Sequence, residues 1–389
     1  MVEARTAAPA IVLSASGPAI KLDLVGIDAI RGLAAILVLF SHARHFVVQD
    51  YSTAPQGLVS TTFYALTGLG HQAVIAFFVL SGFLISRSVV RAEESGNWSW
   101  RGYFTNRLAR LWTVLIPCLV LTAALDLFTI ELTRSSFYAG ELNFYNSGPA
   151  GPVDLSPLAL IGNILFLQTI LVPVFGSNGP LWSLANEFWY YVAFPMIYFA
   201  SPQRFRDLAF VSSAMAACVA GTLLDAQILQ LWPAWLAGYY AQRAAVTVRA
   251  FSRVRTLGSF AVLAGLALIV ILSAAASLLE GLVSDLLLAG AMAIVISALA
   301  HANSTDIATR LSSEWAARAS YSLYVCHFPV LAAISAIALQ NKRMPLGGES
   351  FGMFAALVVS ALGAAVVVYY AVERHTDWTR RLLSAIGPR

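Results

Sequence analysis

The chain has 389 residues, of which 59% are hydrophobic and only 11% are charged. Soluble globular domains carry about 25% charged residues, so this composition excludes an ordinary soluble enzyme and indicates a polytopic membrane protein. The net charge of +4 does not indicate a nucleic-acid partner, because the basic residues lie between apolar runs, where they set the orientation of membrane spans.

Residues 1–20 are rich in Ala, Pro and Ser and are predicted to form a disordered cytoplasmic tail. A membrane-spanning domain is predicted over 21–375, and 376–389 is predicted to be a basic cytoplasmic tail. The candidate spans within this domain are the apolar segments at about 27–47, 71–90, 112–130, 155–172, 181–200, 207–224, 228–243, 257–278, 282–301, 319–339 and 352–372.

Segment 155–172 is the doubtful candidate, because it is flanked by Gly and Pro and contains Asn163 and Gln168. Lys and Arg accumulate on the cytoplasmic side of membrane proteins. If this segment does not cross, 20 of the 24 Lys and Arg residues lie inside, whereas a crossing would leave only 10 inside. We therefore expect an all-α fold with about ten transmembrane helices, a re-entrant or surface helix at 155–172, and both termini in the cytoplasm.

The first predicted span, from Ile27 to Phe46, carries an ionisable residue toward each end. Arg31 and His42 are 11 residues apart, which on a helix separates them by roughly 16 Å and leaves them on nearly the same face. Such residues are costly within a span unless they face the bundle interior or a wet cavity. The pair marks a candidate site, although Arg31 could instead extend to the headgroups while His42 caps the other end.

Five stretches then occur in a recognisable order. They are GIDAIRGLAAILVLFSH (26–42), FFVLSGFLIS (77–86), RLARLWTVLIP (107–117), LWSLANEFWYYVAFP (181–195) and ASYSLYVCHFPV (319–330). In this order they resemble the motifs of the acyltransferase-3 family of integral membrane acyltransferases, in which an Arg and a His stand at the spacing of Arg31 and His42. One departure is Ile75, where many members have an acidic residue, so a close match in acceptor to those members is in doubt.

The resemblance implies an O-acyltransferase that moves an acetyl or other short acyl group from acyl-CoA, with acetyl-CoA as the expected donor. The acceptor would be a hydroxyl of a surface polysaccharide, lipid-linked sugar or secreted glycoside, and the location the bacterial inner (cytoplasmic) membrane. The alternative is a polytopic transporter of a small solute or glycan precursor, although no inverted repeats with paired broken helices are found. A membrane scaffold without catalysis is a third reading, and it predicts that His42 could be replaced at no functional cost.

Three arginines are expected to bind the donor, because guanidinium groups make bidentate contacts with phosphates such as those of CoA. They are Arg31, Arg107 and Arg110, of which the last two lie one helical turn apart. Ser81, in the inner half of its predicted span, is expected to border the same donor site. Anchoring to headgroups and anionic lipid remains the alternative for Arg107 and Arg110.

His42 is the candidate for the chemistry, because histidine can act near neutral pH as a general base or as a nucleophile. Glu187 is expected to lie level with His42, where it would orient the imidazole or hydrogen-bond the acceptor. Its alternative is a solvated acid at a helix end. Arg31 is grouped with these two as catalytic.

Four further residues are predicted to bind the acceptor or to have a structural role. They are Trp182, Tyr321, Ser322 and His327. For His327 a structural role is the alternative to a site role, because a histidine followed by Pro in mid-helix often forms structural hydrogen bonds.

The three cysteines, at positions 118, 218 and 326, have no metal-ligand spacing, so no metal site is expected. The expected partners are the lipid bilayer, acyl-CoA and a carbohydrate or glycoside acceptor. About sixteen residues follow the last predicted span, which leaves no room for the extracytoplasmic hydrolase-like domain of some family members. The chain is therefore expected to reach its final acceptor alone, as a homo-oligomer, or with a separate extracytoplasmic partner.

Overall fold

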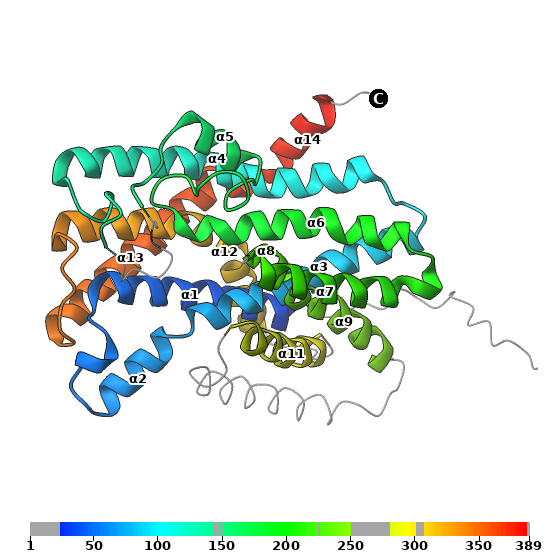
Figure 1. Ribbon diagram of the computed structural model, residues 1–389, viewed down its shortest axis with the longest axis horizontal. Helices are drawn as coiled ribbons and strands as arrows, with labels where there is room; N and C mark the ends of the chain where they lie inside the picture. The colour runs from blue at the N-terminus through cyan, green and yellow to red at the C-terminus, as the bar shows by residue number, and fades with distance from the viewer. Residues whose placement is uncertain are drawn as a thin grey trace, which may run out of the picture.

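A computed structural model describes residues 24–142, 148, 151–224, 226–249, 281–300 and 307–386, with side chains throughout except at 247–249 and 307–318 (Figure 1). The described residues form helices and contain no strand longer than an isolated bridge. The predicted all-α class is thus confirmed. The predicted tail 1–20 and the predicted span 257–278 lie outside the described residues.

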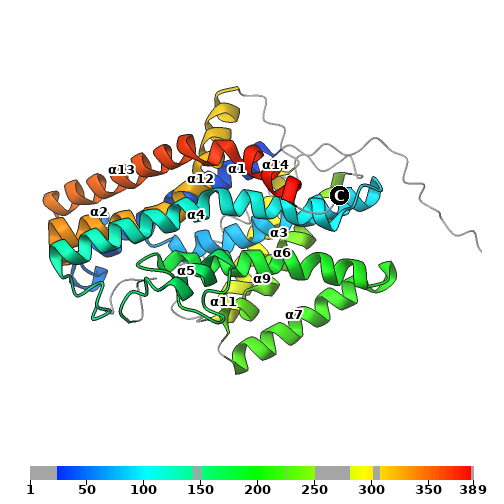
Figure 2. The same ribbon diagram turned by 90° about the horizontal axis from the view of Figure 1, so that it is seen from above.

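The helices follow one another from the first predicted span to the C-terminal segment. They are α1 (Val25–Val47), α2 (Leu58–Thr67), α3 (Gly70–Glu94), α4 (Trp100–Thr133), α5 (Pro157–Ile164), α6 (Trp182–Ala200), α7 (Arg206–Leu223), α8 (Gln227–Gln230), α9 (Trp232–Arg249), α11 (Leu282–Leu299), α12 (Ile307–Ile334), α13 (Gly348–Ala371) and α14 (Thr376–Ile386). A π-helical turn, Ser335–Leu339, extends α12. In both ribbon views α4 and α6 run roughly along the longest axis of the molecule, as α1 does in Figure 1 (Figures 1 and 2).

Within the described ranges, six stretches are long and apolar enough to cross a bilayer. They are Val25–Val47, Leu58–Glu94, Trp100–Thr133, Leu282–Leu299, Ala319–Leu339 and Gly348–Ile386. Helices α6, α7 and α9 have 19, 18 and 18 residues, and at ~1.5 Å per residue they are nearly as long as a ~30 Å hydrocarbon core is thick. The predicted count of about ten spans, and the orientation of both termini, stay predictions.

The helices that will hold the candidate site pack closely in the interior. Helix α1 packs along α12 and α3, and α12 in turn packs against α13 and α4. Helices α3 and α9 approach so closely that a Cβ on Gly82 would lie 2.0 Å from the Trp235 carbonyl oxygen, and one on Gly238 would lie 2.0 Å from that of Val79. This contact explains why the motif FFVLSGFLIS has glycine at position 82.

Segment 155–172, predicted to be a re-entrant or surface helix, contains only the eight-residue helix α5, which at ~1.5 Å per residue is about 12 Å long and too short to cross. Irregular backbone then leads to α6, and its polar side chains are fully buried at Gln168, Ser177 and Asn178. Asn178 Nδ2 donates to the Val325 carbonyl of α12 at 2.8 Å. Asp126 of α4 accepts from the Ser177 amide at 2.6 Å and from its hydroxyl at 2.7 Å. These bonds satisfy the irregular backbone inside protein, and they draw the start of α6 into the interior.

The C-terminal segment, predicted as a basic tail over 376–389, forms helix α14 up to Ile386. Thr113 of α4 donates to the Thr379 hydroxyl at 2.8 Å, and Arg101 donates to the Ser384 carbonyl at 2.7 Å. Helix α14 is therefore docked on α4, and the turn before it is placed beside the arginines of RLARLW.

Candidate functional site

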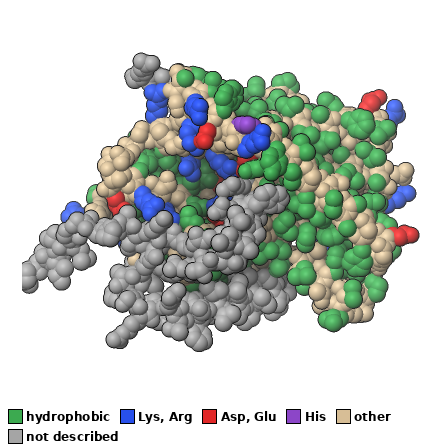
Figure 3. All heavy atoms as spheres, turned by 180° about the vertical axis from the view of Figure 1, so that it is seen from behind, with side chains coloured by type: hydrophobic (Ala, Val, Ile, Leu, Met, Phe, Trp, Pro, Cys, Tyr) green, Lys and Arg blue, Asp and Glu red, His purple; other side chains and the backbone are tan. Residues whose placement is uncertain are grey.

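A cavity of about 200 Å³ lies among helices α1, α3, α4, α6 and α12. Its polar lining consists of Arg31, Ser81, Arg107, Arg110, Ser183, Glu187, Tyr191, Ser320, Tyr321 and Tyr324. The apolar part of the lining comes mainly from α3, with Phe77, Phe78 and Leu84. Seen from behind, the molecule shows a hollow bordered by Lys and Arg side chains (Figure 3). All three arginines predicted to bind the donor thus meet in one cavity.

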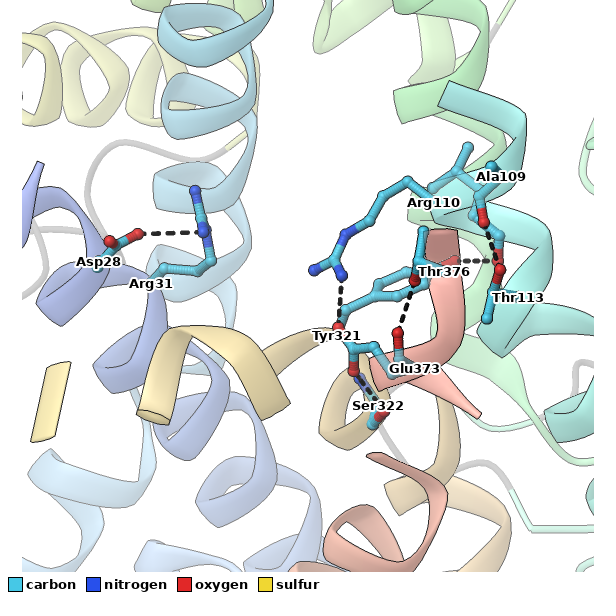
Figure 4. Close-up of polar contacts among 10 residues, drawn as sticks. Asp28, Arg31, Ala109, Arg110, Thr113, Tyr321, Ser322, Glu373 and Thr376 are labelled. Atoms are coloured by element: carbon cyan, nitrogen blue, oxygen red, sulfur yellow. Dashed lines mark hydrogen bonds and ion pairs between the residues drawn. The ribbon is translucent and has the colours of Figure 1, made fainter. Parts of the chain in front are cut away.

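Arg31 reaches this cavity from the first turns of α1. Its guanidinium donates to Asp28 Oδ1 at 3.2 Å, and both side chains are about one-quarter exposed. Asp28 lies one turn before Arg31, so the pair is a local i,i+3 contact on the helix surface. In the close-up, Arg31 of α1 lies on the left and Arg110 of α4 lies on the right (Figure 4).

Arg110 is held by a carboxylate that sequence reasoning missed. Its guanidinium forms an ion pair of 2.6 Å with Glu373, which follows α13 and is buried. Glu373 also accepts from the Ser322 amide at 3.1 Å and hydroxyl at 2.5 Å (Figure 4). Ser322 therefore anchors the acid and does not line the cavity. The sequence places Glu373 at the end of an apolar run next to Arg374, and nothing in that pattern names its partner.

The two aromatic rings beside the arginines are also fixed. Tyr321 donates to the Leu111 carbonyl at 3.0 Å, and the Arg110 guanidinium lies 5.3 Å from its ring centroid. Arg107 lies 5.9 Å from the ring centroid of Tyr103. Cation–π contacts of this length hold guanidinium groups without using their hydrogen-bond donors, so the donors that Glu373 does not occupy stay available to an anion.

Glu187 lies in this cavity and not beside His42, which corrects the expectation that it orients the imidazole. Glu187 Oε1 accepts from the Tyr191 hydroxyl and from Ser81 Oγ, the latter at 3.2 Å. Ser81 Oγ in turn accepts from Trp235 Nε1 at 3.1 Å. The prediction for Glu187 was wrong because α6 starts in the interior, so that its first turns reach the level of Arg31.

Trp182, the first residue of α6, packs against Phe78 with ring centroids 6.2 Å apart. It is half-buried and is not among the residues that line the cavity. Its predicted role in acceptor binding stays a prediction.

His42 instead contacts His327, a pairing that sequence reasoning did not predict. The two rings are nearly parallel, with an interplanar angle of 9°, and His42 Nδ1 lies 2.8 Å from His327 Nε2. Phe328 packs its ring edge-on at 5.1 Å from that of His42. Both histidines are buried, with exposed fractions of 8% for His42 and 1% for His327. The residues were both predicted as candidates, but 285 positions of sequence separate them.

Tyr324 connects this histidine pair with the cavity. Its side chain lines the cavity, and its ring centroid lies 6.0 Å from that of His327. Its hydroxyl is 2.5 Å from Ser183 Oγ and donates to the Pro180 carbonyl at 3.2 Å. Sequence reasoning missed Tyr324, although it lies one helical turn before His327 in the motif ASYSLYVCHFPV.

Among the described residues, no group of three or more His, Cys, Asp or Glu side chains could hold a metal ion. The site therefore consists of a cationic cavity, an apolar wall, and a buried histidine pair beyond Tyr324.

The chain matches the model of the acyltransferase-3 family, described as an acyltransferase domain, over residues 24–370. This range covers nearly all of the helices that form the site. The chain belongs to this family. Its members are acyltransferases that transfer groups other than aminoacyl groups, and the apolar helices agree with a membrane acyltransferase.

Two relatives carry names that describe an activity. The chain is 29% identical over 178 residues to the acyltransferase MdmB of Streptomyces mycarofaciens, covering 45% of this chain and 40% of the relative. It is 27% identical over 165 residues to an O-acetyl transferase of Shigella phage Sf6, covering 42% of this chain and 43% of the relative. The matched stretch thus spans less than half of either relative. No solved structure matches the chain.

Proposed function

We propose that this chain is a membrane O-acyltransferase that moves an acetyl or other short acyl group from acyl-CoA to a hydroxyl of a surface carbohydrate or glycoside. The proposal rests on one observation, which is that two features of the site lie next to each other. A cavity with three arginines adjoins, through Tyr324, a buried histidine pair.

The charge of the cavity supports an anionic donor. Arg31, Arg107 and Arg110 line it together with a single carboxylate, Glu187, so cationic groups exceed acidic ones. Guanidinium groups bind phosphates with bidentate, charge-assisted hydrogen bonds. Glu373 fixes Arg110 from outside the lining, and this preorganisation reduces the cost of ordering the arginine when an anion binds.

The size of the cavity limits how much of the donor enters it. Pockets that enclose a whole drug-sized ligand have volumes of about 300–1,000 Å³, whereas this one has about 200 Å³. We therefore assign it to the acyl and pantetheine end of the donor, with the nucleotide phosphates held by the arginines at the mouth. The apolar wall of Phe77, Phe78 and Leu84 suits an uncharged thioester arm.

The proposed reaction is a direct transfer. The acceptor hydroxyl gives its proton to His42 as its oxygen attacks the thioester carbonyl carbon, which forms the new C–O bond. The C–S bond then breaks, and the CoA thiolate leaves as a thiol after it takes the proton back from His42. Because Tyr324 lies between the cavity and the histidine pair, its side chain has to move aside before the thioester can reach the His42 imidazole.

We further propose a sugar-linked acceptor and a bacterial inner membrane, and two features agree with a hydroxyl acceptor that is reached across a bilayer. The relative from Shigella phage Sf6 is named an O-acetyl transferase, and acetyl groups on oxygen require hydroxyl acceptors. A bilayer site between a cytoplasmic donor and an acceptor on the other side also explains why the chemistry is placed inside a helix bundle.

The test is mass spectrometry of surface glycans from cells with and without the gene, combined with transfer of label from isotopically labelled acetyl-CoA. We expect one ester to be lost from one sugar. His42→Ala should remain inserted in the membrane, yet O-acylation should fall by about 10²- to 10⁴-fold, because a general base contributes that much. Full activity in well-inserted His42→Ala would show that the base is assigned wrongly.

A further inference from the structure

The tautomer of His327 follows from the groups around its Nδ1 atom. This nitrogen lies 2.9 Å from the Leu323 carbonyl oxygen and 2.9 Å from the Tyr324 carbonyl oxygen. Carbonyl oxygens only accept hydrogen bonds, so Nδ1 must carry a hydrogen that it shares between them. A lone pair there would face two oxygens without a donor, inside a site where unpaired polar groups are costly. In the neutral ring, Nε2 of His327 is then a lone-pair acceptor.

The tautomer of His42 follows in turn. His327 Nε2 accepts, and it lies 2.8 Å from His42 Nδ1, so His42 Nδ1 must be the donor. A neutral imidazole has a single N–H. His42 Nε2 is therefore left with a lone pair, and no hydrogen-bond partner of this atom is found among the described residues.

We propose that His327 is a positioning residue that holds His42 in the tautomer with a free Nε2 lone pair, the form that can take a proton from the acceptor hydroxyl. This inference rests on the proposed function, in which His42 is the base. Two carbonyls of α12 fix His327, and His327 fixes His42 across the α1–α12 contact. The orientation is thus dictated by backbone that belongs to a different helix from the base.

The same bond supports the charged intermediate of the reaction. When His42 Nε2 takes the proton, the ring becomes an imidazolium with hydrogen on both nitrogens. Its Nδ1–H still points at the His327 Nε2 lone pair, so the hydrogen bond becomes charge-assisted and strengthens as the charge develops. A neutral acceptor suits a site that is almost closed to water, because a carboxylate in its place would have to be buried as an ion.

The variants His327→Gln and His327→Leu separate this role from packing. The Gln side chain can place its carbonyl oxygen where Nε2 lies and accept from His42, whereas Leu fills space without an acceptor. We expect kcat to fall by about 10- to 100-fold in His327→Leu, since part of the contribution of the base is lost. The KM for acyl-CoA should stay within about twofold, because the arginines are untouched. In His327→Gln, kcat should recover to within about fivefold of the wild type.

His45→Gln is the matched control. His45 lies on α1, the helix of His42, and its Nδ1 donates to the Ser41 carbonyl at 2.8 Å. The same substitution there should leave kcat and KM within about twofold of the wild type. If His327→Gln in folded protein is as slow as His327→Leu, or if His327→Leu keeps full kcat, the positioning role is wrong.

A spectroscopic test needs no activity and no variant at His327. Nitrogen-15 NMR of histidine-labelled protein in lipid distinguishes protonated from unprotonated ring nitrogens, and loss of a signal in His42→Gln assigns that residue. We expect hydrogen on Nδ1 of both His42 and His327 in the resting protein. Hydrogen on Nε2 of His42 would overturn the inference even if His327→Leu fails to fold.

The two proposals fail in different ways. If His42→Ala keeps full acylation, the assignment of the base is wrong whatever the tautomer. If His42→Ala is inactive but the NMR signal shows hydrogen on His42 Nε2, the base stands and the positioning role of His327 falls.

Discussion

At the scale of single residues, two of the three arginines predicted to bind the donor, Arg107 and Arg110, differ in how they are held. Arg110 pairs with Glu373, which is buried and also bound by Ser322. Arg107 contacts the ring of Tyr103, and no carboxylate partner of its side chain is found in the described part of the chain. Both line the cavity. If both arginines bind phosphate, replacing either one should weaken the binding of acyl-CoA. The two replacements should differ in their effect on the stability of the protein.

We predict that Arg107→Gln and Arg110→Gln each raise the KM for acyl-CoA by about 10-fold, which corresponds to losing a charge-assisted hydrogen bond. Saturated turnover should change less, because the contact is made equally in the ground and transition states. Only Arg110→Gln should also lower the melting temperature, since it leaves the Glu373 carboxylate buried with Ser322 alone. Donor titrations and thermal unfolding in lipid nanodiscs measure both. An unchanged KM for acyl-CoA in both variants would mean that the two arginines only anchor the protein to headgroups and anionic lipid.

At the scale of elements, apolar runs predict where helices lie, but not how they are packed. Hydropathy correctly predicted helices over the segments of α1, α3 and α4, and the distribution of Lys and Arg correctly argued against a crossing by the segment of α5. It did not predict that α6 starts in the interior, because that depends on Asp126 binding Ser177 across 51 positions of sequence. The error in the placement of Glu187 follows directly from this. Likewise, the histidine pair depends on the α1–α12 contact, which no local pattern encodes.

The α3–α9 contact provides a test at this scale. We predict that Gly82→Ala destabilises the protein by about 1–3 kcal/mol, because its Cβ would meet the Trp235 carbonyl at 2.0 Å and force the helices apart. Gly290→Ala in α11 is the control, since a Cβ there has no neighbour within 4 Å and alanine favours helix by about 1 kcal/mol. Thermal unfolding in nanodiscs should separate the two variants. Equal stability would mean that the close approach of the two helices is wrong.

At the scale of the whole molecule, the function depends on which way the bundle faces. The three arginines of the cavity lie toward the start of α1 and α4, on the side that the distribution of Lys and Arg predicts to be cytoplasmic. Acyl-CoA is a cytoplasmic metabolite, so the proposed donor port requires this orientation. The reverse orientation would present the arginines to a compartment without donor. Topology is therefore a test of the mechanism as well as of the fold.

We predict that Pro152→Cys, before α5, reacts with a membrane-impermeant thiol reagent added to intact cells, while Arg204→Cys, between α6 and α7, reacts only after permeabilisation. Both positions are exposed, so burial would not prevent labelling at either one. The background for both should lack the native cysteines, of which Cys118 and Cys326 are buried and Cys218 is partly exposed. Labelling of Arg204→Cys from outside would place the loop after α6 on the far side. With Pro152→Cys also labelled, the segment between them would cross the membrane an even number of times. The positive-inside count would then be wrong, and with it the cytoplasmic donor port.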